Sequence, residues 1–531
     1  MWLLSLILLP IVFGLLQYVF PFKFRIWVAF ILQFGINILL ISIGIHFEPL
    51  RLQLSMSALP YGMVLNLDAL SYTLILLNNI VFMLMTVFNR ENRYMDALFL
   101  FLFLSLQGLI NGIFLSFDLF NTYLLIEVST VTVSILIMYK RDSRSMYDGM
   151  IYLLANMFAM VFFLMGIGYL YKYFGVLDFE NLKAAISGVK SSSLLYLPYA
   201  FIITGVSLKA AIMPLFSWLP KAHGTPSAPS VVSAVLSGIY VKTGVYLIIR
   251  MNAIFSVLDL SFLFVVLGMI TAILGFTFAI AQKDIKLILA YSTISQVGLI
   301  MFGLSGSNPA QQAGGLYHLF NHGIIKVLLF LIAGILIDTF KTRNISEMHN
   351  LWHYSKFMSI VLIIALFGIT GAPFFSGSYS KYYISYGIQN QAMQYIVQLS
   401  NLGTILTFIK FFKVIWQKDQ NIQKHIQVKL TRGNVITLIF LSSMVFIFGF
   451  FGSITMPWLT HYKGTLSFLD QVAKLPNYLI LIIMGFGFYK LGFNNSTLFK
   501  TFEAVDLGFN AIAGTVVAFF MGMLMLLNFV A

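Results

Sequence analysis

The stretch Ser207–Arg250, SLKAAIMPLFSWLPKAHGTPSAPSVVSAVLSGIYVKTGVYLIIR, decides how the rest of the chain can fold. Its two apolar segments are joined by a proline-containing break, and each segment carries one lysine, Lys209 and Lys242. A lysine near the centre of a bilayer costs about 2.5 to 3.5 kcal/mol on insertion scales, so it is expected to face protein or water. A helix opened by Pro214 and Pro220 is tolerated at membrane depth only in the same surroundings. Lysines beside a broken helix therefore predict an ion path.

The composition places the whole chain in a membrane. Of 531 residues, 60% are hydrophobic and only 9% are charged, and the mean hydropathy is +0.91, which excludes a soluble globular protein. The chain has no cysteine, so disulfides, thiolate metal sites, cysteine-ligated iron-sulfur clusters and cysteine catalysis are excluded. We expect no cofactor and no catalytic redox site in this chain. Any redox chemistry would belong to a partner, and membership of an enzyme complex stays open.

The predicted fold is an all-α polytopic membrane protein with about sixteen transmembrane helices. A spanning helix needs about 20 mostly apolar residues. The predicted segments are 2–20, 26–46, 69–88, 97–116, 118–139, 149–171, 195–215, 229–250, 257–281, 286–303, 314–338, 357–387, 394–416, 434–455, 475–489 and 508–530. The first segment is kept as a helix because it lacks a basic leader and a small-residue cleavage site.

The distribution of Lys and Arg predicts the orientation of these helices. With the N-terminus outside, the inner connections hold nineteen basic residues and the outer connections seven. Because cytoplasmic loops are enriched in Lys and Arg, we expect both termini to lie outside a cell membrane. Most of the formal net charge of +14 then reflects topology, and nucleic acid is not an expected partner.

Six lysines and one well-embedded acid remain inside the predicted segments. The acid is Glu127, and the lysines are Lys209, Lys242, Lys326, Lys381, Lys410 and Lys413. Arginine stays charged at any accessible pH, whereas a buried lysine can release its proton, so lysine suits a proton relay. Lys410 and Lys413 lie near the inner end of a segment, where simple snorkelling of the side chain is an equal alternative.

The segments also suggest internal symmetry. We expect N-terminal helices in 1–96, one five-helix repeat in 97–250, a second in 257–416, and C-terminal helices in 434–531. The fourth helix of each repeat is interrupted, at IMPLFSWLP and at GITGAPFFSGSYSKYY, which contains Pro373. Five spans per unit force opposite orientations, and inverted repeats with paired broken helices are typical of transporters. Lys209 and Lys381 are 172 residues apart, which supports correspondence at the level of helices.

Histidines supply further titratable groups. His318, His322 and Lys326 follow one another at spacings of four on one helix face. With no third ligand nearby, a metal site is disfavoured, and both a protonatable row and structural hydrogen bonding stay open. His223 and Lys221, after the first break, are a candidate entrance from the inner side, although His223 could equally cap its turn.

Several motifs together resemble a known family. SLKAAIMPLFSWLPKAH, SGIYVKTGVYLIIR, KDIKLILAYSTISQVG, HLFNHGIIKVLLFLIAG and GITGAPFFSGSYSK, within roughly residues 60 to 420, are similar to the antiporter-like subunits of respiratory complex I, membrane-bound hydrogenases and Mrp-type cation/proton antiporters. The resemblance implies a fourteen-helix core of two inverted repeats, other membrane subunits as partners, and a chain of buried titratable groups across the membrane.

The resemblance also assigns roles to residues. Glu127 and Lys209 resemble the family's ion pair, Lys242 its bridging lysine and Lys381 its exit-side group, and His322 and Lys326 fall in the motif between them. Many members have an Asp where Lys221 stands. A long lateral helix expected of the largest complex I subunit is missing, which favours the D-type subunit of the Mrp antiporters.

The hypothesis is therefore an electrostatic switch. When the pair of Glu127 and Lys209 opens, Lys209 loses its counter-charge in a medium of low dielectric constant, so its proton moves toward Lys242 and on to Lys381. Three functions stay open: a subunit of a Na⁺ or K⁺/proton antiporter, a proton-pumping subunit of a complex I-like oxidoreductase or hydrogenase, and a partner that keeps the fold without pumping. Six intramembrane lysines disfavour the third.

Overall fold

The chain forms an almost entirely helical bundle, here described from a computed structural model. The structure describes residues 2–20, 24–54, 63–91, 94–224, 228–417, 427–464, 466–491 and 497–530. One antiparallel hairpin, β1 (Leu50–Gln53) and β2 (Val64–Leu67), joins the second and third helices. Four basic residues that we assigned to inner connections lie outside the described residues: Lys23, Arg93, Lys418 and Lys424.

The helices of the first half follow the predicted segments closely. They are α1 (Trp2–Val19), α2 (Arg25–Ile45), α3 (Ala69–Phe88), α4 (Ala97–Leu115), α5 (Leu119–Ile137), α6 (Ser143–Phe174), α7 (Phe179–Ser187), α8 (Ser193–Lys209), α9 (Trp218–Gly224), α10 (Ser230–Val235), the π-helix η1 (Leu236–Tyr240), α11 (Val241–Ile254) and the short 3₁₀-helix η2 (Ser256–Leu258).

The second half contains the second five-helix unit and the C-terminal helices. They are α12 (Ser261–Ala281), α13 (Ile285–Leu304), α14 (Pro309–Phe340), the 3₁₀-helix η3 (Ile345–Glu347), α15 (Leu351–Tyr354), α16 (Lys356–Thr370), α17 (Ser376–Ser385), α18 (Gln391–Trp416), α19 (Arg432–Phe450), α20 (Gly452–Thr460), α21 (Phe468–Ala473), α22 (Leu475–Lys490), α23 (Thr497–Glu503) and α24 (Phe509–Val530).

Sixteen apolar helical segments agree with the predicted number of spans. Fourteen helices in the described part of the chain are long and apolar enough to cross a membrane, counting α10 to α11 and α21 to α22 as one span each. Two shorter apolar helices, α8 and α16, make up the remaining two. These two are the first halves of the helices that we predicted to be broken.

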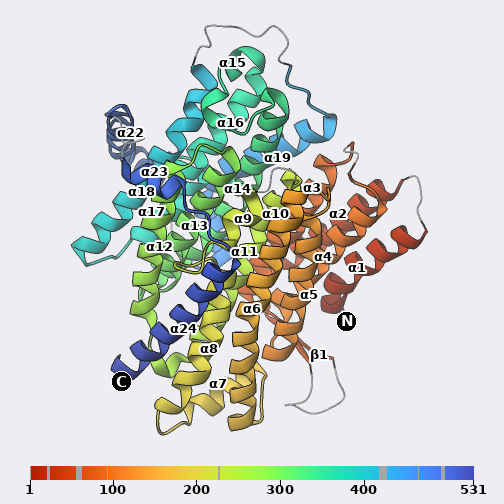
Figure 1. Cartoon of the computed structure of the whole chain (residues 1–531), viewed down its shortest axis with the longest axis vertical. Coiled ribbons are helices and arrows are strands. Elements are labelled where there is room, and N and C mark those ends of the chain that lie inside the picture. The colour runs from red at the N-terminus through yellow and green to blue at the C-terminus, as the bar shows by residue number, and fades with distance from the viewer. Residues whose placement is uncertain are drawn as a thin grey trace.

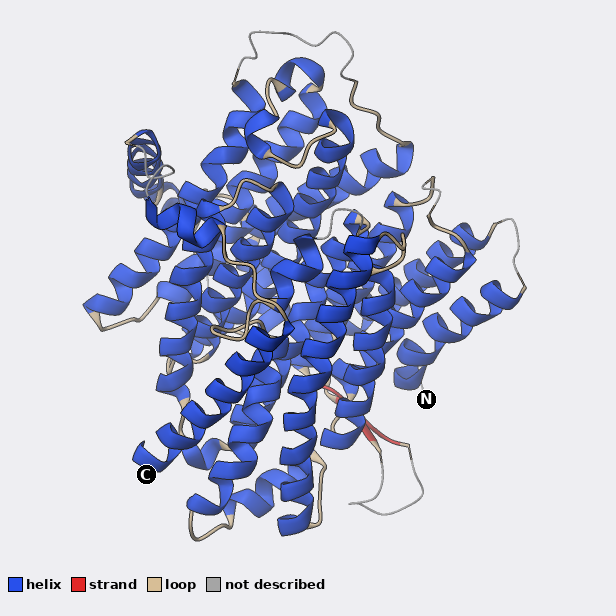
Figure 2. Ribbon diagram, in the orientation of Figure 1, coloured by secondary structure: helices blue, strands red, loops and turns tan. Residues whose placement is uncertain are grey.

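The most buried helices lie where the two units meet. In the apolar 18-residue stretch of α10 to α11, 94% of the residues are buried. The buried share is 89% in α3 and in α13, and only 6% in α21 to α22. Figure 1 shows α9, α10, α11, α13 and α14 at the centre of the view, with α1 and α2 on one flank and α22 on the other. The helices of the bundle fill almost the whole of Figure 2, with the one red hairpin at its lower side.

Amide side chains connect the first four helices inside the bundle. Gln107 donates to Asn79 over 2.7 Å and accepts from Gln33 over 2.8 Å. Asn111 accepts from Asn78 over 2.8 Å and donates to the Leu6 carbonyl over 2.9 Å. Because lipid offers no partner to a polar group, hydrogen bonds between helices hold them in register. This network explains the buried Asn and Gln without a role in transport.

Both predicted breaks are present, and each contains a residue in the left-handed region. The first break joins α8 to α9 and holds Ala211 at a φ of 53°, followed by Pro214. The second joins α16 to α17 through Gly371 at a φ of 83° and contains Pro373. Pro220 lies in the first turn of α9, where a missing backbone N–H costs nothing. Pro220 therefore lies just after the break, inside the second half-helix, which begins at Trp218.

The C-terminal helices span both five-helix units. α22 packs against α18 of the second unit, and α24 packs against α6 and α8 of the first. α23, which lies between α22 and α24 in the chain, packs against α12 of the second unit. We call residues 497–508, which comprise α23 and the segment leading to α24, the strap. The strap carries the chain from one unit to the other within a single subunit.

Candidate functional site

Lys209 is the last residue of α8, and its amine points at α5. The side chain is buried, and its Nζ donates to Thr130 Oγ1 over 2.5 Å. Glu127, one turn before Thr130 on the same helix face, is half-buried, and its Oε1 has no donor among the described residues. The predicted direct ion pair between Glu127 and Lys209 is therefore not formed in this structure, because the Thr130 hydroxyl takes its place.

A tyrosine from η1 completes this cluster. The Tyr240 hydroxyl lies 3.2 Å from Thr130 Oγ1 and 3.1 Å from Ser129 Oγ. The Lys209 Nζ lies 5.6 Å from the centre of the Tyr240 ring, within the range of a cation–π contact. Neutral hydroxyls and a ring face thus hold the amine while the carboxylate is one helical turn away.

Lys242 follows directly on the π-helix. The Lys242 side chain is fully buried, and its Nζ donates to the backbone carbonyl of Ser237, five residues earlier. A π-helical turn loosens the regular i to i+4 hydrogen bonding, and such turns occur often at functional sites. The Ser237 hydroxyl lies 2.6 Å from Thr293 Oγ1 on α13. The π-helix therefore supplies both a carbonyl for Lys242 and a hydroxyl link to the second unit.

Three glycines allow these elements to approach closely. A Cβ on Gly244 would lie 2.2 Å from the backbone nitrogen of Ala210, so α11 touches the break just after Lys209. A Cβ on Gly238 would lie 2.5 Å from Val327 Cγ2, and one on Gly323 would lie 2.8 Å from the Gly238 carbonyl oxygen. The π-helix consequently packs directly on α14.

Lys326 on α14 is held by α13. Its Nζ donates to the Leu289 carbonyl over 2.9 Å and to the Ser292 hydroxyl. The side chain is fully buried, and its Nζ lies 5.6 Å from the centre of the Phe408 ring. A lysine bound only by neutral oxygens and a ring can give up its proton without leaving a carboxylate unpaired.

The two histidines of α14 differ in their surroundings. His318 Nδ1 lies 2.8 Å from Ser380 Oγ on α17, and Nε2 lies 3.0 Å from Gln296 Oε1 on α13. Both ring nitrogens of the buried His322 have no hydrogen-bond partner among the described residues. The ring centres of His318 and His322 are 6.1 Å apart. His318 is thus fixed by hydrogen bonds, and His322 has both nitrogens free to accept or donate a proton.

Lys381 lies at the second break. It is on α17, is 6% exposed, and donates from Nζ to the carbonyl of Ile369 at the end of α16 over 3.0 Å. Unsatisfied carbonyls at a helix end carry partial negative charge, so they suit an amine. Lys209 ends the half-helix before the first break, whereas Lys381 lies in the half-helix after the second, so the two lysines do not occupy equivalent positions relative to the breaks.

These groups form one row across the bundle. Electrostatic interactions connect Lys242 with His318, His322 and Lys326, and connect His318 with Lys381. The row runs from α5 and α8 through η1, α11, α13 and α14 to α17. The structure therefore brings together the residues that we predicted for the relay: Glu127, Lys209, Lys242, His318, His322, Lys326 and Lys381.

The predicted entrance residues lie on different sides of α9. Lys221 is 7% exposed, forms an ion pair with Asp506 of the strap, and borders a cavity of about 240 Å³. His223 is fully buried, and its ring stacks on Phe330 at a centre distance of 4.6 Å. Both ring nitrogens of His223 lack a hydrogen-bond partner among the described residues, so it does not cap its turn.

Lys410 and Lys413 have separate surroundings away from the row. Lys410 is buried, and its Nζ donates to the carbonyls of Ile280 and Gln282 at the end of α12, over 2.5 and 2.7 Å. A cation at a helix C-terminus is stabilising, so Lys410 has a structural explanation. Lys413 is exposed, with its Nζ 4.1 Å from the centre of the Tyr489 ring.

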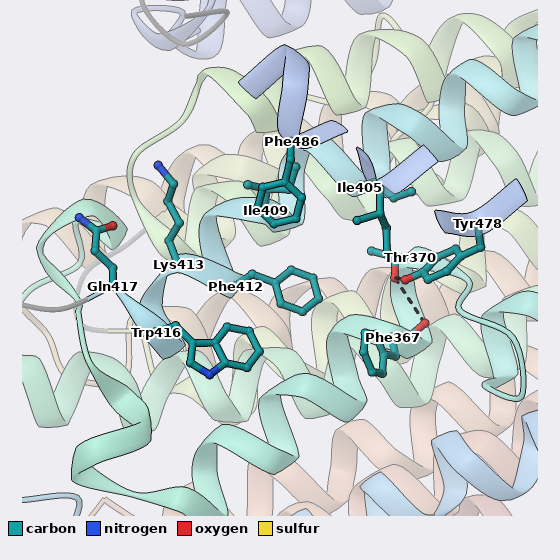
Figure 3. A pocket seen from close by; sticks show the side chains of 11 residues that line it. Phe367, Thr370, Ile405, Ile409, Phe412, Lys413, Trp416, Gln417, Tyr478 and Phe486 are labelled. Atoms are coloured by element: carbon teal, nitrogen blue, oxygen red, sulfur yellow. Dashed lines mark hydrogen bonds between the residues drawn. The ribbon is translucent and has the colours of Figure 1, made fainter. Parts of the chain in front are cut away.

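Lys413 lies at the edge of an apolar pocket on the outside of the second unit. The pocket, about 580 Å³ in volume, lies between α16, α18 and α22. Figure 3 shows Phe367, Phe412 and Phe486 along it, Lys413 and Gln417 at one end, and the Thr370 to Tyr478 hydrogen bond of 2.8 Å at the other. None of the row residues lines this pocket, so it is separate from the candidate proton path.

Hydroxyl and amide groups of α13 are functional candidates that the sequence reasoning missed. Ser292 binds Lys326, Thr293 binds Ser237, and Gln296 joins His318 to Thr404 Oγ1, 3.0 Å away. Their presence at successive turns of one buried helix, in AYSTISQVG, was a signal that could have found them. Polar groups on a fully buried helix require partners.

Lys286 was also missed, because it was counted in an inner connection. It is 2% exposed and donates from Nζ to the Ala228 carbonyl over 2.8 Å. It borders a second cavity, about 720 Å³ in volume, that is also lined by Lys140 and Asp338. Among the residues that the structure describes, no three His, Cys, Asp or Glu side chains are grouped so that they could hold a metal ion.

Comparisons with known sequences identify the family of the chain. The family model described as NADH:quinone oxidoreductase/Mrp antiporter, TM, matches residues 116–407, which is 292 of 531 residues. The D-type subunit of the Na⁺/H⁺ antiporter of Alkalihalophilus pseudofirmus is 26% identical over 404 residues, which are 74% of this chain and 81% of that protein. The N-type subunit of the NADH-quinone oxidoreductase of Desulforudis audaxviator is 30% identical over 381 residues, 69% and 75% of the two chains.

Two solved structures share the fold. A chain of the Mrp complex from Dietzia sp. superposes with a TM-score of 0.79 at 18% identity, over 91% of this chain and 99% of that one. A chain of the membrane-bound sulfane sulfur reductase, an archaeal respiratory membrane complex, gives 0.78 at 21% identity, over 90% and 99%. Family model, relatives and fold agree, and the chain belongs to the NADH:quinone oxidoreductase/Mrp antiporter transmembrane family.

Proposed function

We propose that the chain is the proton-translocating, antiporter-like subunit of a multi-subunit Na⁺ or K⁺/proton antiporter of Mrp type. The observation that carries this proposal is the row of buried amines and imidazoles from Lys209 to Lys381, which ends near a broken helix on each side. Burying several cationic groups beside one half-buried acid is costly, and it is reasonable only if protons move among them.

The contacts suggest how a proton passes along the row. Lys209 can turn from Thr130 toward Glu127, one helical turn away, and this turn changes the counter-charge that its amine meets. Lys242 receives the proton through the hydroxyl cluster around Tyr240. Repulsion between neighbouring cations keeps Lys242 and Lys326 from being charged together, so transfer proceeds one step at a time toward Lys381.

Exchange in membrane vesicles tests this proposal. The complete complex is expressed in cells that lack their own antiporters, and everted vesicles are energised to an acid interior. Addition of Na⁺ or K⁺ is expected to raise the interior pH, as read by a pH-sensitive dye. Vesicles that contain the assembled complex but give no response to either cation would contradict the antiporter assignment.

A second function is supported by one relative and one structure. The relative from Desulforudis audaxviator and the fold shared with a respiratory membrane complex favour a proton-pumping subunit of a complex I-like oxidoreductase or a membrane-bound hydrogenase. Purification of the assembled complex separates the two functions. Iron-sulfur subunits that purify with the chain would favour this second function, and membrane subunits alone favour the antiporter.

We further propose that both termini lie outside the cell membrane and that the repeats comprise 97–250 and 257–416. The basic asymmetry, the sixteen apolar segments and the position of both chain ends in the lower half of Figure 1, toward α7 and away from α15, support this orientation. Because the chain lacks cysteine, single cysteines can report it. An impermeant maleimide added to whole cells should label Lys183→Cys and leave Lys429→Cys unlabelled. The reverse pattern would show that both termini lie inside.

A further inference from the structure

The strap brings a carboxylate to the cavity beside α9. Asp506 forms an ion pair with Lys221 and lies 3.9 Å from the Arg144 guanidinium. Arg144 in turn binds Asp148 over 2.9 Å. Asp506 is 63% exposed, whereas Lys221 is 7% exposed, so the pair connects the aqueous surface with the interior.

The cavity of about 240 Å³ continues inward from this pair. One wall is formed by Ser217, directly before α9, and by Pro220, Lys221 and Gly224 on one face of α9. The opposite wall includes Tyr291 of α13, the residue that precedes Ser292. Ser292, the next residue of α13, binds Lys326, so the cavity and the row contact neighbouring residues of one helix.

Asp506 is surrounded by charged and titratable groups from each element packed against it. These groups are Arg144, Tyr147 and Asp148 of α6, Lys221 of α9, Lys283 after α12, Tyr291 of α13 and Glu503 of α23. Glu503 is occupied by Lys283, 3.2 Å away, at the rim. Asp506 is thus the strap carboxylate that contacts the buried lysine of the cavity.

We infer that Asp506 and Lys221 form the proton-loading pair at the inner mouth of the path, with the strap delivering the carboxylate. This inference rests on the proposed function. When protons enter from the inner side, a carboxylate at the mouth raises the local proton concentration and passes each proton to the end of the cavity that Lys221 lines. This matters most when protons are scarce. The strap is therefore part of the transport machinery as well as a link between the two units.

The test is the pH dependence of exchange in the reverse direction, in which everted vesicles that contain the complete complex are loaded with Na⁺ or K⁺ and diluted into cation-free medium, so that protons enter from the bath through the inner mouth. The variant Asp506→Asn is expected to lose about threefold or more in rate near pH 8.5 and to stay close to wild type near pH 6.5. The matched control is Glu180→Gln, which removes one carboxylate from an exposed ion pair with Arg51 and should change neither rate. The conservative Asp506→Glu variant, which keeps a carboxylate at the mouth, should retain at least half of the wild-type rate near pH 8.5.

Three results would overturn the inference. They are wild-type rates for Asp506→Asn at both pH values, an equal loss at both pH values, as for a merely structural strap, and the same loss for Asp506→Glu as for Asp506→Asn at normal subunit abundance. Lys209→Ala, measured in parallel, separates this inference from the proposed function. An inactive Lys209→Ala with an unaffected Asp506→Asn rejects only the loading pair, whereas an active Lys209→Ala rejects the relay itself.

Discussion

Replacing Lys209 by alanine is expected to lower cation-driven proton movement in everted vesicles by more than about tenfold, because removal of a positioned proton-transfer group typically costs that much or more. Lys209 is the amine that contacts the α5 cluster, through the 2.5 Å bond to Thr130. Alanine leaves no group there that can bind a proton between Glu127 and the Tyr240 hydroxyl. The measurement is the initial rate of dye recovery after addition of Na⁺ or K⁺.

The matched control is Lys413→Ala. It removes an amine of the same type from the same chain, but at an exposed position over Tyr489 and outside the row. This variant should exchange within about twofold of wild type, since exposed contacts of this kind contribute little. Equal rates for Lys209→Ala and wild type, with equal amounts of protein in the membrane, would remove Lys209 from the path.

The Thr130 hydroxyl gives Lys209 an alternative partner to Glu127 in the proposed electrostatic switch. The resemblance to the family implied a pair of Glu127 with Lys209, and the structure instead has Lys209 on Thr130, three residues away on the same helix face. A rotation of the Lys209 side chain is enough to exchange these partners, because Glu127 and Thr130 are neighbours on one face of α5. The closed pair and the hydroxyl-bound state then differ mainly in counter-charge, which is what an electrostatic switch requires.

The helices and both breaks were predictable from the sequence because apolar length and proline leave strong signals. Sixteen apolar segments appear where expected, and the row lysines are buried as the cost of membrane charges requires. The position of the strap was not predictable. Asp506 is more than 280 residues from Lys221 in sequence, and an exposed acid between two helices carries no signal of its tertiary partner.

The local backbone geometry of η1 was also not predictable from the sequence. SGIYVK is apolar and reads as an ordinary helix, yet η1 is π-helical and directs the Ser237 carbonyl to Lys242. The polar residues Ser292, Thr293 and Gln296 of α13 indicated a possible functional site. Polar residues in a buried helix can also be structural, as Asn79 and Gln107 are between α3 and α4. Only the three-dimensional contacts separate these two uses of the same residue types.

Lys242 decides whether the row moves protons or only supplies fixed positive charge. It is fully buried and binds the Ser237 carbonyl of η1, and its electrostatic interactions with His322 and Lys326 of α14 make it the link between the two units. Arginine carries the same charge but stays protonated at any accessible pH, whereas lysine can release its proton. A change from lysine to arginine therefore removes proton transfer and keeps the charge.

The most direct measurement compares wild type, Lys242→Ala, Lys242→Arg and Lys242→His in everted vesicles at equal subunit abundance. A relay predicts that Lys242→Ala and Lys242→Arg both lose more than about tenfold in exchange, and that Lys242→His, which titrates near neutral pH, keeps a measurable part of it. Exchange by Lys242→Arg at close to the wild-type rate would contradict proton transfer through this lysine and, with it, the proposed path.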